Sequence, residues 1–133
     1  MQMALHGCSI LVVEDDPLIG LSIAEMIRRE RGTPVGPAAN SKEALSAMEG
    51  SELHGALLDI ALKGETVFAL ADAIRDRHIP FVFLTGHFEP QIPSRFRNVP
   101  VLEKPCSSGE MVSLLKAEIQ RNSADADVRG EPQ

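Results

Sequence analysis

Aromatic residues and cysteines are both scarce in this chain of 133 residues, which has no tryptophan, no tyrosine, five phenylalanines and two cysteines. Cys8 and Cys106 lack the paired spacing of a zinc or redox site. They stand at the entry of the first predicted strand and just past the exit of the last, roughly 15 Å or more apart at strand geometry. A disulfide needs Cα atoms within about 7 Å. We therefore expect two ordinary thiols.

Long hydrophobic runs and basic clusters are also missing. No apolar run approaches the roughly 20 residues that span a bilayer, and the N-terminus does not read as a signal peptide. The formal net charge is -6, and no basic cluster exceeds residues 28–31. Membrane insertion and direct nucleic-acid binding are therefore disfavoured, and we expect a cytoplasmic protein.

The length fits a single domain. We expect an N-terminal extension over residues 1–7, a domain over 8–121, and a disordered tail over 122–133, where large apolar side chains are almost absent. The short distance from the last predicted helix to the end of the chain predicts a stand-alone domain without a separate output domain.

Five short apolar runs alternate with helical patterns. We expect strands at residues 9–13, 35–38, 56–59, 81–84 and 99–104, and helices at 17–31, 41–50, 67–77 and from Ser107 or Ser108 to about 121. Residues 60–65 read as a loop. This alternation predicts an α/β fold with a doubly wound five-stranded parallel sheet, for which we expect the flavodoxin-like order 2-1-3-4-5. Pro90 and Pro93 interrupt the space for a fourth helix, which should be short or mobile.

Polar residues follow four of these strands directly. The first strand ends in Glu14-Asp15-Asp16, the third in Asp59, the fourth in Thr85 and the fifth in Lys104. Because ligands of doubly wound sheets bind outside the carboxyl ends of the strands, these side chains should meet at one edge.

This edge is suited to a metal ion and a phosphoryl group. Three carboxylates, Asp15, Asp16 and Asp59, repel one another unless a cation compensates, and Mg²⁺ prefers such oxygen ligands. Asp59 can then act as a nucleophile toward phosphorus, while Lys104 and Thr85 contact the phosphoryl oxygens. Each feature alone is more often a helix cap or a turn. Their joint placement at one edge, in chain order, favours the functional interpretation.

These motifs resemble the response-regulator receiver domain over about residues 8–121. The resemblance implies that Asp59 is the phosphoacceptor and that a sensor histidine kinase or histidine phosphotransfer protein is the donor. It also implies that Asp16 and Asp59 ligate Mg²⁺ directly, that Asp15 acts through water, and that the Ala61 backbone carbonyl completes the ligand set. The Lys104–Pro105 bond should then be cis.

Residues 80–88, Pro-Phe-Val-Phe-Leu-Thr-Gly-His-Phe, are similar to the strand-four pattern Pro-Phe-x-Phe-Ala-Thr-Gly-Tyr-Gly. That pattern is typical of the single-domain FATGUY-type receivers of alphaproteobacteria. The loop at residues 59–68 is also similar to that subgroup, whereas Leu84 and His87 depart from the pattern.

Many receivers report phosphorylation through an aromatic side chain on the fifth strand, but this chain has Val101 and Leu102 there. We therefore expect the switch and partner segment to comprise Thr85, Gly86, His87, Phe88, Val101 and Leu102, with phosphorylation ordering residues 86–98. His87 either overhangs the phosphoryl group or is an exposed loop histidine.

The predicted function is that of a stand-alone, monomeric two-component response regulator that signals through protein contacts. It would catalyse only its own phosphorylation and dephosphorylation, and would act as a shuttle, a sink or a regulator. The alternative is a protein-interaction module with the receiver fold that does not cycle phosphate. A hydrolase is disfavoured, because Ala61 stands where a second catalytic acid would be needed.

Overall fold

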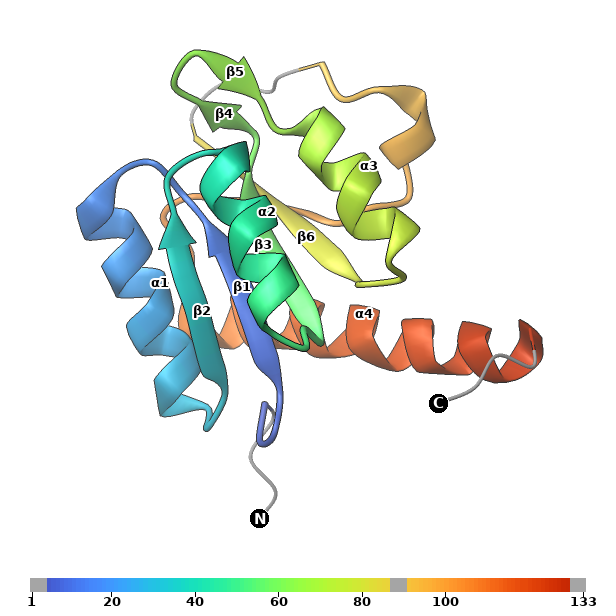
Figure 1. Cartoon of the computed structure of the whole chain (residues 1–133). Helices are drawn as coiled ribbons and strands as arrows, with labels where there is room; N and C mark the ends of the chain where they lie inside the picture. Colours follow the sequence, from blue (N-terminus) through green and yellow to red (C-terminus); the bar gives the residue numbers. More distant parts are fainter. Residues whose placement is uncertain (1–4, 87–90, 130–133) are drawn as a thin grey trace.

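Five parallel strands form the centre of the molecule (Figure 1). The computed structural model describes residues 5–86 and 91–129, with side chains described through residue 122. The strands are β1 (Ser9–Val13), β2 (Thr33–Ala38), β3 (Gly55–Asp59), β6 (Phe81–Thr85) and β7 (Val101–Glu103). Their order is β2-β1-β3-β6-β7, which confirms the predicted flavodoxin-like order.

Helices cover both faces of the sheet (Figure 1). On one face, α1 (Pro17–Arg29) and α4 (Ser108–Arg129) bury an apolar layer that includes Ile23, Ile27 and Leu115. On the other, α2 (Ser41–Gly50) and α3 (Phe68–Asp76) pack on a second layer. The central strand β3 is buried at every position, as expected for a strand covered on both sides.

The helix starts follow the sequence closely. The Asp16 side chain caps α1, as predicted, and Pro17 occupies the first helical position. At the start of α4, the Ser107 hydroxyl accepts from the Glu110 amide while Glu110 accepts from the Ser107 amide, a reciprocal capping box. The cap of α2 is Asn40, one residue before the predicted start.

The last helix is longer than predicted. It runs to Arg129, beyond its predicted end at about residue 121. The disordered tail over residues 122–133 stays a prediction. Residues 130–133 lie outside the described part of the chain. The physical reason is helix cooperativity: once α4 is nucleated by its packed first turns, each further residue adds a backbone hydrogen bond at little cost.

The segment after β6 contains only a short 3₁₀ helix, η1 (Ser94–Phe96), in its described part, in line with the predicted short fourth helix. Phe96 is 1% exposed and packs against Phe81 and Phe83. Arg95 makes a two-pronged ion pair with Asp72 on α3, at 2.9 and 3.0 Å. Residues 94–96 are therefore packed against the core and α3 in the described structure. That phosphorylation orders residues 86–98 stays a prediction, and residues 87–90 lie outside the described residues.

A hairpin takes the place of the predicted loop after β3. Two-residue strands β4 (Ala61–Leu62) and β5 (Glu65–Thr66) pair antiparallel, and Gly64 in the turn has a φ of 77°. Glycine adopts this left-handed conformation without steric cost. The hairpin leaves β3 at Asp59 and brings its backbone over the carboxyl edge of the sheet (Figure 1).

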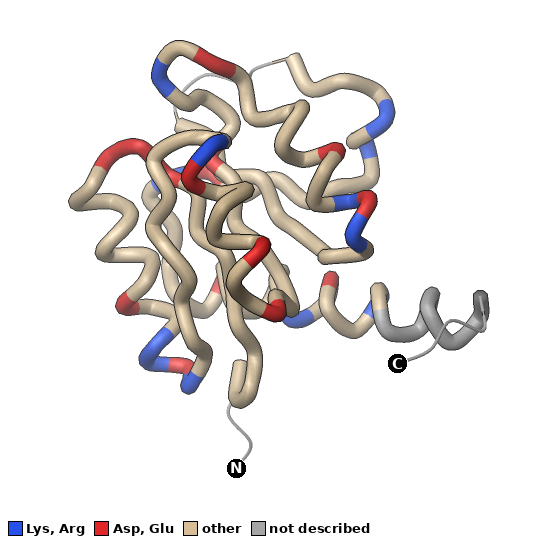
Figure 2. Tube along the Cα trace, in the orientation of Figure 1, with Lys and Arg blue, Asp and Glu red and all other residues tan. Residues whose placement is uncertain are grey.

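Basic and acidic positions are interspersed along the described chain. Basic positions lie in small separate groups, chiefly at the end of α1 and around α3 and η1, with acidic positions between them (Figure 2). No helix in the described ranges is long and apolar enough to cross a membrane. Cys8 and Cys106 are both free thiols, as expected.

Candidate functional site

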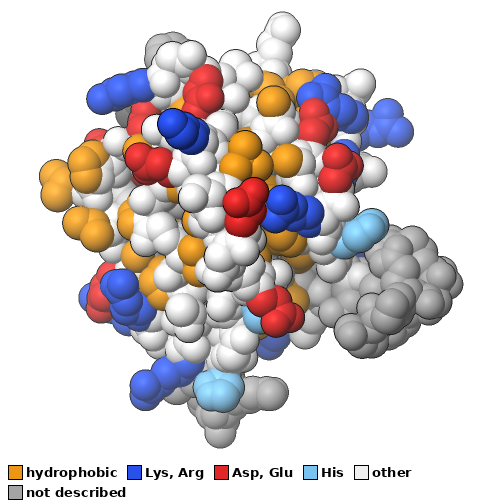
Figure 3. Space-filling model, viewed as in Figure 1, with side chains coloured by type: hydrophobic (Ala, Val, Ile, Leu, Met, Phe, Trp, Pro, Cys, Tyr) orange, Lys and Arg blue, Asp and Glu red, His pale blue; other side chains and the backbone are white. Residues whose placement is uncertain are grey.

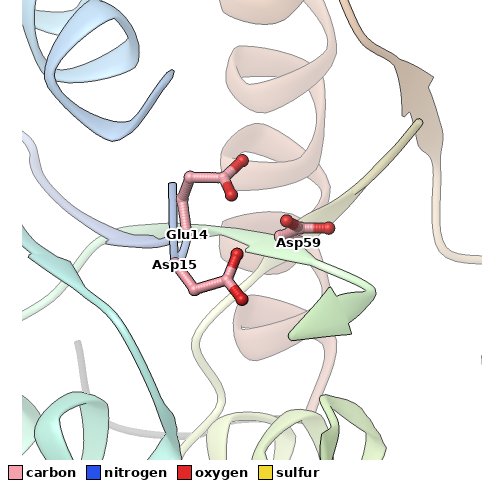
Figure 4. Close-up of side chains that lie close together, drawn as sticks. All are labelled: Glu14, Asp15 and Asp59. Carbon is pink, nitrogen blue, oxygen red and sulfur yellow. The ribbon is translucent and has the colours of Figure 1, made fainter. Parts of the chain in front are cut away.

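Three carboxylates meet at the carboxyl edge of the sheet: Glu14 and Asp15, directly after β1, and Asp59 at the end of β3 (Figure 4). The two strands are neighbours, and Val13 pairs with Leu58, so the residues that follow are brought side by side. Each of the three acids offers one oxygen, and these oxygens all lie within 4.8 Å of one another.

Asp16 is outside this cluster, contrary to its predicted role as a direct metal ligand. Its Oδ1 accepts hydrogen bonds from the amides of Leu18 (3.0 Å) and Ile19 (3.3 Å), and the residue is exposed. Sequence reasoning assigned Asp16 both to the helix cap and to the metal, but its side chain turns toward the helix. Glu14 occupies the place in the acidic cluster that had been assigned to Asp16. The signal was available, because the residue before a proline at the first helical position is the natural N-cap.

Lys104 comes from the end of β7 and closes the cluster. Its Nζ lies 2.7 Å from Glu14 Oε1 and 3.2 Å from Asp59 Oδ2, and its side chain is 18% exposed. Its backbone amide donates to the Thr85 carbonyl at 2.7 Å, which joins β7 to the end of β6. Thr85 itself is buried beside the edge. The Lys104–Pro105 bond is cis, as the resemblance implied.

Burial and charge crowding set the protonation chemistry of the site. Burial, together with the neighbouring Asp59, raises the pKa of Glu14 to about 7, although hydrogen bonds from Lys104 and the Asp16 amide oppose the rise. Burial lowers the pKa of Lys104, but its contacts with Glu14 and Asp59 outweigh burial, so the net pKa is raised and the ammonium stays charged. One cation thus faces three acids that repel one another.

Backbone amides from the hairpin hold two of the acids. The Ala61 amide donates to Asp59 Oδ1 at 3.1 Å, and the Lys63 amide donates to Asp15 Oδ2 at 2.7 Å. Sequence reasoning gave Lys63 no part in the site, since a backbone donor carries no signature in the residue type. Ala61 lines the site, and the metal-ligand role of its carbonyl stays a prediction.

The donor set fits a hard divalent cation. The acids, Ala61 and Lys104 line an open hollow of about 480 Å³, and among the described residues Lys104 is the lysine that forms ion pairs with these acids. Mg²⁺ is bound in proteins by one or two carboxylates together with water or phosphate oxygens, which such an open site allows. Glu14, Asp15 and Asp59 are therefore the residues that could hold the metal.

The predicted switch residues divide between buried and exposed positions. Leu102 is buried under the sheet edge, whereas Val101 is 42% exposed on the edge strand β7. Gly86 is exposed beside the acidic hollow. His87 and Phe88 lie outside the described residues.

A flavodoxin-like sheet whose carboxyl edge joins three acids to a lysine is the architecture of receiver-type signalling domains. Comparison with protein families supports this assignment, because the family model described as "Response regulator receiver domain" matches residues 10–116. The chain belongs to this family.

Several known proteins are similar along most of the chain. The solution structure of SdrG from Sphingomonas melonis Fr1 is 37% identical, with a TM-score of 0.75, and the match covers 88% of this chain and 98% of that one. The response regulator PhyR from Brucella abortus is 25% identical, with a TM-score of 0.74, over 96% of this chain and 54% of that one. Among curated proteins, the transcriptional regulatory protein PdtaR of Mycobacterium tuberculosis (strain CDC 1551 / Oshkosh) is 25% identical over 126 residues. This match covers 92% of the present chain but only 62% of PdtaR, so the chain spans less than two thirds of that relative.

Proposed function

We propose that this protein is a two-component response regulator that accepts a phosphoryl group on Asp59 and signals through protein contacts. The observation that carries the proposal is the placement of Asp59 within one hollow with two further acids and the Lys104 ammonium. The donor is a phosphorylated histidine of a sensor kinase or of a histidine phosphotransfer protein.

The chemistry needs positioning more than covalent assistance. An oxygen of the Asp59 carboxylate attacks phosphorus, the bond from phosphorus to the donor nitrogen breaks, and its electron pair returns to the imidazole ring. Lys104 and the Thr85 hydroxyl hold the equatorial oxygens of the transferred group. Mg²⁺, when bound by Glu14, Asp15 and Asp59, supplies charge neutralisation at the phosphoryl oxygens.

An apolar surface beside the site is suited to the donor. A hollow of about 500 Å³ next to Lys104 is lined mainly by apolar side chains, among them Ile19, Met26 and Pro105. Leu18 and Leu21 of α1 are 80% and 57% exposed. Figure 3 shows exposed hydrophobic side chains over the region of α1. A donor that packs its apolar face here brings its histidine toward Asp59.

The output surface in this proposal is the edge formed by Thr85, Gly86 and the exposed Val101. The likeness of residues 80–88 to the FATGUY-type pattern supports placement in that single-domain subgroup. In this proposal the receiver works as a stand-alone, monomeric unit. Its only catalysis would be its own phosphorylation and dephosphorylation.

The decisive experiment is phosphorylation with acetyl phosphate and Mg²⁺. Wild type should give a shifted band on a phosphate-affinity gel, Asp59→Asn should give none, and Asp76→Asn, on the exposed end of α3, should behave as wild type. Absence of a shift in wild type would favour the interaction module that does not cycle phosphate. A shift that persists in Asp59→Asn would place the phosphoacceptor elsewhere.

A further inference from the structure

The β4–β5 hairpin has too few contacts of its own to fix its position. Each strand is two residues long, and even longer isolated two-stranded hairpins are marginally stable in water. The Leu62 side chain is buried beneath the hairpin, but the turn of the hairpin, Lys63 and Gly64, is exposed. The hairpin nevertheless supplies the backbone amides that hold Asp59 and Asp15, so something outside it must set its place.

One outside contact comes from α2. The Glu65 Oε1 accepts a hydrogen bond of 2.8 Å from the amide of Ser41, a residue 24 positions earlier in the chain. Ser41 is the first residue of α2, and the first amides of a helix have no partner within it. The helix N-terminus also favours a negative charge, so the Glu65 carboxylate is stabilised there both by the hydrogen bond and by the helix dipole.

The hairpin connects the N-terminus of α2 to the acidic cluster. Within the hairpin, Glu65 pairs with Leu62. Lys63, which follows Leu62 in the chain, donates its backbone amide to Asp15 Oδ2 at 2.7 Å. A displacement of the hairpin therefore moves the donor that orients Asp15. Because metal-ligating carboxylates depend on such supporting hydrogen bonds, the effect reaches the metal site.

We propose that Glu65 is a positioning residue that fastens the β4–β5 hairpin to the N-terminus of α2 and thereby orients Asp15 and Asp59 for Mg²⁺. The inference rests on the proposed function, since it assigns a support to that same site. Glu65 touches neither the metal ligands nor Lys104 in any described contact.

Two variants remove this hydrogen bond from opposite sides. Glu65→Ala deletes the acceptor, and Ser41→Pro deletes the donor at a position where proline suits a helix. Asn40, the residue before it, is already extended, as a residue preceding proline must be. Glu65→Gln keeps an oxygen acceptor. Glu43→Ala is the matched control, because Glu43 accepts from the Ala39 amide at the same helix end without contacting the hairpin.

The first measurement is Mg²⁺ affinity by calorimetry. Glu65→Ala and Ser41→Pro should each weaken it by about tenfold, as is typical when a support of a metal ligand is lost. Glu65→Gln should retain most of the affinity, and Glu43→Ala should stay within about twofold of wild type. Unchanged affinity in Glu65→Ala, or an equal loss in Glu43→Ala, would overturn the proposal.

The second measurement needs no metal. In EDTA, amide hydrogen exchange at Lys63 should be at least about tenfold faster in Glu65→Ala and Ser41→Pro than in wild type, and unchanged in Glu43→Ala. If wild type binds no Mg²⁺, the proposed function fails while this exchange result still tests the hairpin anchor. Equal exchange at Lys63 in all four proteins would refute the anchor itself.

Discussion

Replacing Lys104 by methionine removes the one ammonium that contacts the acidic cluster in the described structure while keeping most of the side-chain volume. Its Nζ contacts Glu14 at 2.7 Å and Asp59 at 3.2 Å, and its side chain is largely buried. The variant therefore loses two charge-assisted hydrogen bonds and leaves two buried acids without their cation. We expect a loss of stability whose size depends on pH.

The magnitude follows from the protonation of Glu14. Its pKa in the folded protein is about 7, above the ordinary value of 4.5, so its contribution to stability is complete below pH 4.5 and is lost as pH rises through 7. At pH 8, one unit above this pKa, ionisation of Glu14 lowers the free energy of the folded wild type by about 1.4 kcal/mol relative to a protein in which Glu14 stays protonated. Without Lys104 the pKa of Glu14 rises further, and this lowering is lost.

The expected deficit of Lys104→Met is therefore about 3 kcal/mol at pH 5.5, from two lost hydrogen bonds to a charged group at about 1.5 kcal/mol each. It should grow to about 4–5 kcal/mol at pH 8. Millimolar Mg²⁺ should reduce the deficit at pH 8, because a second cation can take over the role of the ammonium.

The assay is urea unfolding followed by far-ultraviolet circular dichroism in EDTA, since the chain has no tryptophan or tyrosine to report by fluorescence. The control is Lys116→Met, at an exposed position of α4. A deficit equal at the two pH values, or larger at pH 5.5, would refute the assignment of Glu14 and Lys104 as an interacting pair.

Three further predictions concern the ligand set, protonation and the anchor of η1. Asp15→Asn should weaken Mg²⁺ affinity at least about tenfold in calorimetry. Asp16→Asn should change the affinity less than about threefold, because asparagine caps a helix as well as aspartate does. A larger loss in Asp16→Asn than in Asp15→Asn would show that Asp16, and not Asp15, is the metal ligand. The Glu14 carboxyl, followed by carbon NMR in EDTA, should titrate with a midpoint near the pKa of about 7, and a midpoint near 4.5 would show that neither burial nor Asp59 raises it. Phe96→Ala should lower the free energy of unfolding by about 3–5 kcal/mol, as for other buried phenylalanines, and a loss below about 1 kcal/mol in urea would show that η1 is not anchored there.

The sheet was predictable because hydrophobic patterning is a local signal. Apolar runs that are buried on both faces, separated by amphipathic helices, leave few alternatives to a doubly wound sheet. The edge that would carry Asp59, Thr85 and Lys104 followed from the same pattern, since the carboxyl ends of parallel strands lie together.

The errors came from places where local sequence allows two outcomes. Asp16 can cap a helix or face the site, and only the direction of the chain after β1 decides between them. The hairpin after Asp59 was predicted as a loop because two-residue strands have no pattern to detect. The end of α4 was misplaced because helix propagation needs no apolar side chains.

The fold class, the order of the polar strand ends and the family of the chain all depend on residue types at fixed spacings, so they were predictable. Which acids face one another, and which backbone amides hold them, depends on how the strands assemble. Glu14 enters the cluster through its contact with Lys104, 90 residues away, and Asp15 is held by an amide 48 residues away. Contacts at such separations arise only when the strands are assembled, and no local pattern encodes them.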